Sequence, residues 1–83
     1  NADDEELTFL ALNIVGALVE NFVEEGYCDP TLYKGVKLAV LIAKKLGIEE
    51  FTEKLEFLKI RAGNLVEETI EREGMDISRE EWS

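Results

Sequence analysis

The stretch that decides the fold is TFLALNIVGALV, residues 8–19, which carries no charged side chain although the whole chain has a formal net charge of −10. Nine of its twelve residues are apolar. A surface helix needs an apolar stripe along one side only, so this segment predicts a helix that is covered from more than one direction. What covers it is the main question that the sequence raises.

The length of 83 residues predicts one helical domain over 1–83, with 1–2 as a tag remnant and 75–83 as a tail. A chain this short buries roughly 60–65% of its unfolded surface, so its own core is marginal and a partner is expected. Cys28 is the only cysteine, which excludes an internal disulfide and favours a reducing cytoplasm. The absence of His and the many Glu and Lys residues are typical of a thermophilic protein.

The charge balance and the hydropathy pattern argue against two classes of partner, nucleic acids and membranes. The chain has 19 acidic and 9 basic residues, and this acid excess argues against non-specific nucleic-acid binding. No uninterrupted run of about 20 apolar residues occurs, so no bilayer-spanning helix is expected. These observations predict a cytoplasmic protein that binds neither nucleic acid nor a membrane.

Glycine, proline and aspartate mark the ends of the expected helices. Gly26, Gly47 and Gly74 each follow a long periodic segment, where a left-handed C-terminal cap is favoured. Asp29-Pro30 is a typical helix start, since Asp caps the free amides and Pro suits the first turn. We therefore expect an all-α, antiparallel up-down-up three-helix bundle, with helices at about 4–25, 30–46 and 49–73 and a short helical turn at 78–82.

The apolar arc of the first helix is wider than those of the other two. The second helix should bury Leu32, Val36, Ala39, Val40, Ala43 and Leu46, and the third Phe51, Leu55, Leu58, Ala62, Leu65, Val66 and Ile70. These stripes are too narrow to cover the first helix, so a further neighbour is expected. Its contact residues are predicted to be Leu7, Leu10, Ala11, Leu12, Ile14, Val15, Leu18, Val19 and Phe22.

The simplest such neighbour is a second copy of the chain, because most soluble oligomers are symmetric. A different partner protein is the alternative. The sequence thus favours a homo-dimer and a small acidic, non-catalytic interaction module, such as an adaptor, regulatory or antitoxin-like subunit. Leu12→Glu or Val19→Glu is expected to disrupt the assembly.

Two further groups of residues are candidate docking sites. Residues 30–46 carry four lysines and no acid, so the remaining residues carry −14. The first group is this lysine face, made of Lys34, Lys37, Lys44 and Lys45 around Leu41. It is either solvated or binds an acidic partner, and a nucleic-acid phosphate backbone is the alternative.

The second group is Phe57 and Ile60, which lie outside the apolar stripe of the third helix. These two residues are expected to contact either another chain or the C-terminal tail. Trp82 in that tail could itself anchor a partner.

One acidic motif raises the possibility of metal-assisted chemistry. Glu67, Glu68 and Glu71 form an EExxE on the third helix, where Glu67 and Glu71 are one turn apart and could bridge a divalent ion. This motif resembles the helical EExxE of magnesium-dependent all-α nucleotide pyrophosphatases. The resemblance implies, as an alternative function, a magnesium-dependent nucleotide hydrolase. Such enzymes also need a facing acidic pair; Glu20 and Glu24 on the first helix have the right spacing, as chance pairs also would.

The remaining catalytic residue types are scarce. No His exists to activate Cys28 or a serine, and one Cys without His cannot build a zinc site. The six glycines are isolated, so no phosphate-binding loop is expected. The sequence therefore predicts a protein that is not an enzyme and binds no cofactor.

Overall fold

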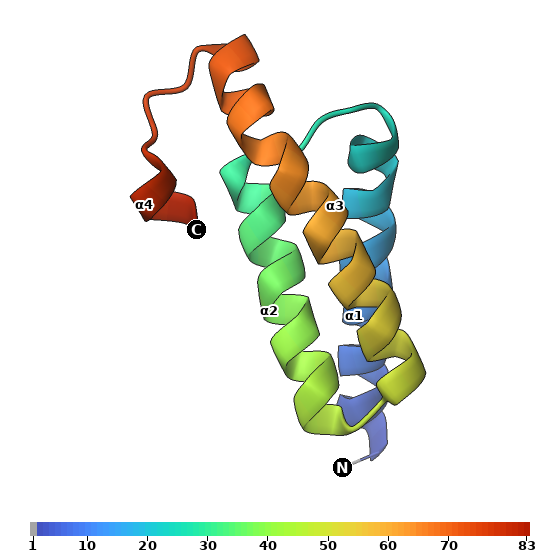
Figure 1. The fold of residues 1–83 in the computed structure, drawn as a ribbon. Coiled ribbons are helices and arrows are strands. Elements are labelled where there is room, and N and C mark those ends of the chain that lie inside the picture. The colour runs from blue at the N-terminus through green and yellow to red at the C-terminus, as the bar shows by residue number, and fades with distance from the viewer. Residues whose placement is uncertain (1) are drawn as a thin grey trace.

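The computed structural model describes residues 2–83 and is a bundle of helices 44 × 24 × 18 Å in extent (Figure 1). Asn1, half of the expected tag remnant, lies outside the described residues. The helices are α1 (Ala2–Glu24), α2 (Pro30–Leu46), α3 (Glu49–Glu73) and the short α4 (Arg79–Trp82). The predicted all-helical fold is confirmed, and the predicted helix ends agree with the structure to within two residues.

The helix ends follow the local chemistry that the sequence indicates. The Asp29 carboxylate accepts a hydrogen bond from the Leu32 amide at 2.8 Å, which caps the start of α2. Its other oxygen accepts one from the Tyr27 hydroxyl at 3.1 Å. Gly47 ends α2 and Gly74 ends α3, with φ values of 72° and 67° that other residues rarely adopt. The short connections between these ends place successive long helices side by side (Figure 1).

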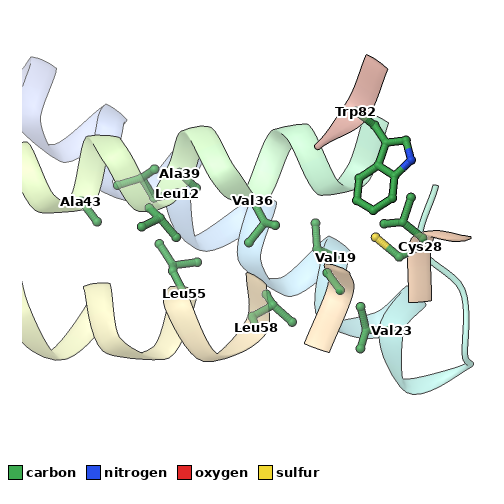
Figure 2. Close-up of a cluster of buried hydrophobic side chains, with 13 residues drawn as sticks. Leu12, Val19, Val23, Cys28, Val36, Ala39, Ala43, Leu55, Leu58 and Trp82 are labelled. Carbon is green, nitrogen blue, oxygen red and sulfur yellow. The ribbon is translucent and has the colours of Figure 1, made fainter. Parts of the chain in front are cut away.

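The core lies between the three long helices, and α2 and α3 share the most extensive contact. Figure 2 shows its side chains converging from the three helices, with Cys28 and Trp82 at one end. The buried apolar residues of the described chain are Leu12, Val19, Val23, Cys28, Val36, Ala39, Val40, Ala43, Leu55, Leu58, Ala62, Val66 and Trp82.

Three residues depart from the predicted stripes. Leu46 of α2 was expected to be buried but is 39% exposed, because it lies at the end of the helix beyond the core. Thr52 and Thr69 of α3 are buried, although threonine is polar. The Thr52 hydroxyl donates to the Ile48 carbonyl at 2.7 Å, and the Thr69 hydroxyl accepts from a backbone amide, so neither is buried without a partner.

The C-terminal turn α4 closes one end of the bundle against α2. The ring of Trp82 meets that of Tyr33 edge-on, with centroids 5.4 Å apart. Tyr33 in turn fills the space left by Gly63 of α3, where a Cβ atom would lie only 3.1 Å from the tyrosine ring. A small residue in α3 thus makes room for the aromatic pair that holds α4 in place.

A candidate protein-interaction surface

Helix α1 exposes an unusual amount of apolar surface. Six of its large apolar side chains are exposed, with exposed fractions from 36% at Phe22 to 64% at Leu7. Phe9, Leu10, Ile14 and Leu18 lie between these values. Contiguous apolar patches on soluble proteins usually mark a binding site. The exposed side of α1 is therefore the candidate functional site.

Two contacts fix the direction in which this side points. A Cβ atom on Gly16 would lie 3.3 Å from Leu55 of α3, and one on Gly35 of α2 would lie 3.9 Å from Val15. Gly16 therefore faces α3, and Val15 faces α2. At about 100° per residue, Ile14 then projects away from α3, on the outer side of the α1–α2 pair.

Helix α2 continues the same apolar surface. Its Tyr33 and Lys44 face α3, so the opposite side of α2 carries Leu38 and Ile42, with Leu41 at the edge. These three leucine and isoleucine side chains are 40–57% exposed. We define the outer face as the following residues of both helices: Leu7, Leu10, Ala11, Ile14, Leu18, Phe22, Leu38, Leu41 and Ile42.

Three residues that the sequence assigned to the contact surface do not belong to the outer face. Leu12 and Val19 are 3% and 1% exposed and lie in the core of the bundle. Val15 is half-buried and packs against that core. These three side chains hold α1 to its own chain, so we remove them from the candidate interface.

The expected lysine face is divided between two sides of α2. Lys44 pairs with Glu56 of α3 at 2.8 Å, and this hydrogen bond lowers the pKa of the Glu56 carboxyl. Lys37 donates to the Ser83 carbonyl at 3.1 Å. Lys34 and Lys45, one turn before and two turns after Leu38, remain exposed on the outer side. Only this second pair borders the outer face.

The second expected docking group is also divided. Phe57 and Ile60 of α3 are 66% and 62% exposed, so the tail does not cover them. Trp82 is instead only 7% exposed and contacts Tyr33, on another side of the bundle. Trp82 is therefore a core residue of this chain and not an exposed anchor for a partner.

The acidic motif on α3 contributes one of its residues, Glu67, to a surface ion pair. Glu67 accepts a hydrogen bond from Arg79 at 3.1 Å, which ties α3 to the start of α4. Glu68 and Glu71 are exposed. Across the described residues, 2–83, no group of three or more His, Cys, Asp or Glu side chains is arranged to hold a metal ion. The structure thus offers no assembled site for the EExxE motif.

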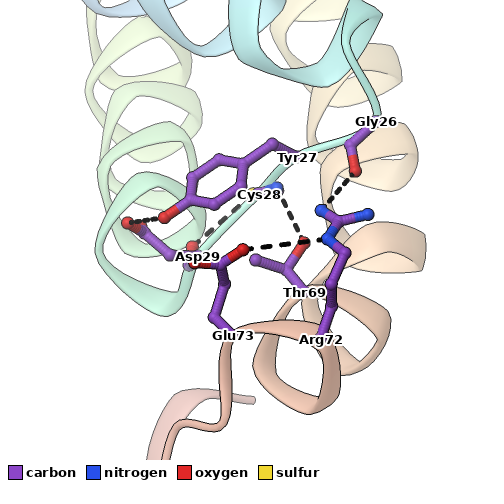
Figure 3. Close-up of polar contacts among 7 residues, drawn as sticks. All are labelled: Gly26, Tyr27, Cys28, Asp29, Thr69, Arg72 and Glu73. Carbon is purple, nitrogen blue, oxygen red and sulfur yellow. Dashed lines mark hydrogen bonds and ion pairs between the residues drawn. The ribbon is translucent and has the colours of Figure 1, made fainter.

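Sequence reasoning did not find the polar junction where the α1–α2 loop meets the end of α3 (Figure 3). The Cys28 amide donates to the Thr69 hydroxyl at 3.0 Å, and the Arg72 guanidinium donates to the Gly26 carbonyl at 3.0 Å. Both bonds pair backbone groups of the α1–α2 loop that have no hydrogen-bond partner within a helix. The junction positions the C-terminal end of α1 and hence one end of the outer face.

Thr69→Val is expected to destabilise the chain by about 1–3 kcal/mol, because the buried Cys28 amide loses its acceptor while the shape of the side chain is kept. Thr69→Ser keeps the hydroxyl and should lose about 1 kcal/mol for the missing methyl group. Urea denaturation followed by far-UV circular dichroism measures both values. A valine variant as stable as the parent protein would show that this hydrogen bond is unimportant.

Cys28 is expected to react slowly with thiol reagents. Burial, followed by the charge of Asp29, raises the pKa of its thiol from 9.0 to about 11. At pH 8 this shift lowers the thiolate fraction, and with it the alkylation rate, by about 100-fold. Iodoacetamide labelling measured by mass spectrometry should therefore be slow for the native chain and fast in denaturant. Equal rates in the two conditions would contradict the buried thiol.

Helix α1 also meets the length and composition of a membrane-spanning helix, contrary to the sequence-based expectation. Residues 3–24 form 22 residues of helix, within which the most apolar 18-residue window has a mean hydropathy of 1.5 and is 17% buried. The same helix contributes Leu12, Val19 and Val23 to the core of the bundle. Its high hydropathy thus arises from two apolar sides, one packed and one exposed.

Comparisons with protein-family models, with curated proteins and with solved structures found no match for this chain.

Proposed function

We propose that this chain is a protein–protein interaction module that associates with a second copy of itself through the outer face. The observation that carries the proposal is the row of large, exposed apolar side chains along α1, from Leu7 to Phe22. This row runs along nearly the whole helix and continues onto α2 at Leu38 and Ile42. A surface of this length and shape suits another helical surface better than a small ligand.

A second copy is favoured as the partner for two reasons. Closed two-fold dimers are the commonest soluble oligomers, and a self-complementary face needs no other protein. A chain of 83 residues also gains stability when an exposed apolar face is covered. Covering this face on two copies contributes on the order of 10 kcal/mol, the same order as the entropic cost of association. Because these two free energies are similar, a single substitution in the outer face should change the dissociation constant of the dimer strongly.

Ile14→Glu is expected to convert a dimer into a monomer, because it places a charge in the middle of the outer face. Ile60→Glu on α3 is the matched control, since Ile14 and Ile60 are 58% and 62% exposed and the substitution is the same. Light scattering coupled to size-exclusion chromatography gives the mass of each variant, and circular dichroism checks that both stay helical. A monomeric parent protein at high micromolar concentration, or a dimeric Ile14→Glu variant, would overturn the proposal.

A further inference from the structure

The two helices of the outer face carry opposite charge. Helix α1 has six acidic residues and no basic one, and its first turn holds Asp3, Asp4 and Glu5. Helix α2 has four lysines and no acidic residue. On the outer side, Lys45 and Lys34 lie near the two ends of α2, with the apolar residues between them. Charge is therefore segregated between these two helices, since α1 is acidic and α2 is basic.

Two symmetric arrangements can bring the outer faces of two copies together. With the two-fold axis perpendicular to the helices, α1 lies on α1 of the partner copy, and α2 lies on α2. Acidic helix ends then meet acidic ends, and lysines meet lysines. With the axis parallel to the helices, each α1 lies on α2 of the other copy. Only this second arrangement brings opposite charges together.

We propose that each α1 packs antiparallel against α2 of the second copy, which makes a four-helix bundle of two layers with the acidic first turn of α1 beside Lys45. This inference rests on the proposed self-association and specifies its geometry. Within one chain, α1 and α2 are antiparallel, and a two-fold axis parallel to them preserves the height of every residue. Each α1 therefore keeps its antiparallel relation to the α2 that it covers.

The positions of residues along the helix axes identify which residues of the two copies meet. Gly35 lies against Val15, and Leu46 lies near Glu5 at the other end of the same helix pair. Leu38 is thus within about 3 Å of the height of Ile14, at 1.5 Å of rise per residue. In the proposed arrangement, Ile14 of one copy faces Leu38 of the other. In the alternative arrangement, Ile14 lies close to its own counterpart near the middle of α1.

Cysteine cross-linking separates the two arrangements. We expect Ile14→Cys and Leu38→Cys chains, mixed and mildly oxidised, to give a disulfide-linked dimer that neither variant gives alone. The native Cys28 is buried, and the parent protein is the control for its reaction. Cross-linking of Ile14→Cys alone, or no cross-link in the mixture while both variants are dimeric, would overturn the arrangement but not the self-association. Monomeric variants and a monomeric parent protein would overturn both.

A charge reversal gives an independent readout. Lys45→Glu is expected to raise the dimer Kd about tenfold, because two lysine–acid contacts per dimer become repulsive. Lys54→Glu on α3 changes the net charge equally and should leave the Kd within about twofold. Analytical ultracentrifugation measures both constants. An unchanged or lower Kd for Lys45→Glu would contradict the pairing, because the alternative arrangement places lysine against lysine.

Discussion

Val19→Glu is expected to unfold the chain and not merely to dissociate it. Val19 is 1% exposed and lies in the core beside residues of the other helices. Burying a carboxylate there costs about 4–5 kcal/mol or more. A domain of this length has a total stability of about 4–12 kcal/mol. The variant should therefore lose most of its cooperative thermal transition, measured by far-UV circular dichroism.

The control is Ile14→Glu, which makes the same substitution on the same helix but at a side chain that is 58% exposed. It should keep the helical signal and a cooperative transition. The contrast separates the two sides of α1, because one variant tests the core and the other tests the outer face. A Val19→Glu variant with the parent midpoint would mean that α1 packs in another orientation.

Trp82→Ala is expected to lower the free energy of unfolding by about 3–5 kcal/mol. The side chain is 7% exposed, contacts the Tyr33 ring and covers the end of the core at Cys28 (Figure 2). Its removal leaves a cavity and frees α4 from α2. Chemical denaturation followed by circular dichroism is the suitable measurement, since the chain has no other tryptophan for fluorescence.

Trp82→Phe is the control for this position. The Trp82 indole nitrogen is buried and has no hydrogen-bond partner in the described chain. Phenylalanine keeps an aromatic ring against Tyr33 and removes that donor, so the loss should be well below that of the alanine variant. An alanine variant as stable as the phenylalanine variant would show that α4 adds little to the core.

The positions of the helices could be predicted because local chemistry determines them. Glycine at the C-terminal caps and Asp29-Pro30 at the start of α2 specify backbone conformations without help from distant residues. Thr69 could not be predicted as buried, because its partner is a backbone amide 41 residues away in the sequence. The choice between Trp82 as a tail residue packed on its own chain and as an anchor for a partner stayed open for a similar reason, since its burial depends on the space that Gly63 leaves for Tyr33.

The candidate site could be predicted only in part. Periodicity shows that most of the circumference of α1 is apolar, but it does not show which part faces α2 and α3. Val19 and Leu18 are adjacent in the sequence, yet one is 1% and the other 49% exposed. The directions of the neighbouring helices decide between them, and these directions follow from tertiary packing.

The exposed pair Phe57 and Ile60 on α3 has a consequence for the size of any assembly. A second exposed apolar patch on a different side of a subunit can join subunits head to tail into open filaments. The charged side chains beside this pair have both signs: Glu53 and Lys54 lie one turn before Phe57, and Arg61 lies one turn after it. Charge repulsion therefore does not prevent contact between two such patches. A dimer formed through the outer face alone is closed, whereas a second contact through Phe57 and Ile60 would extend the assembly beyond two copies.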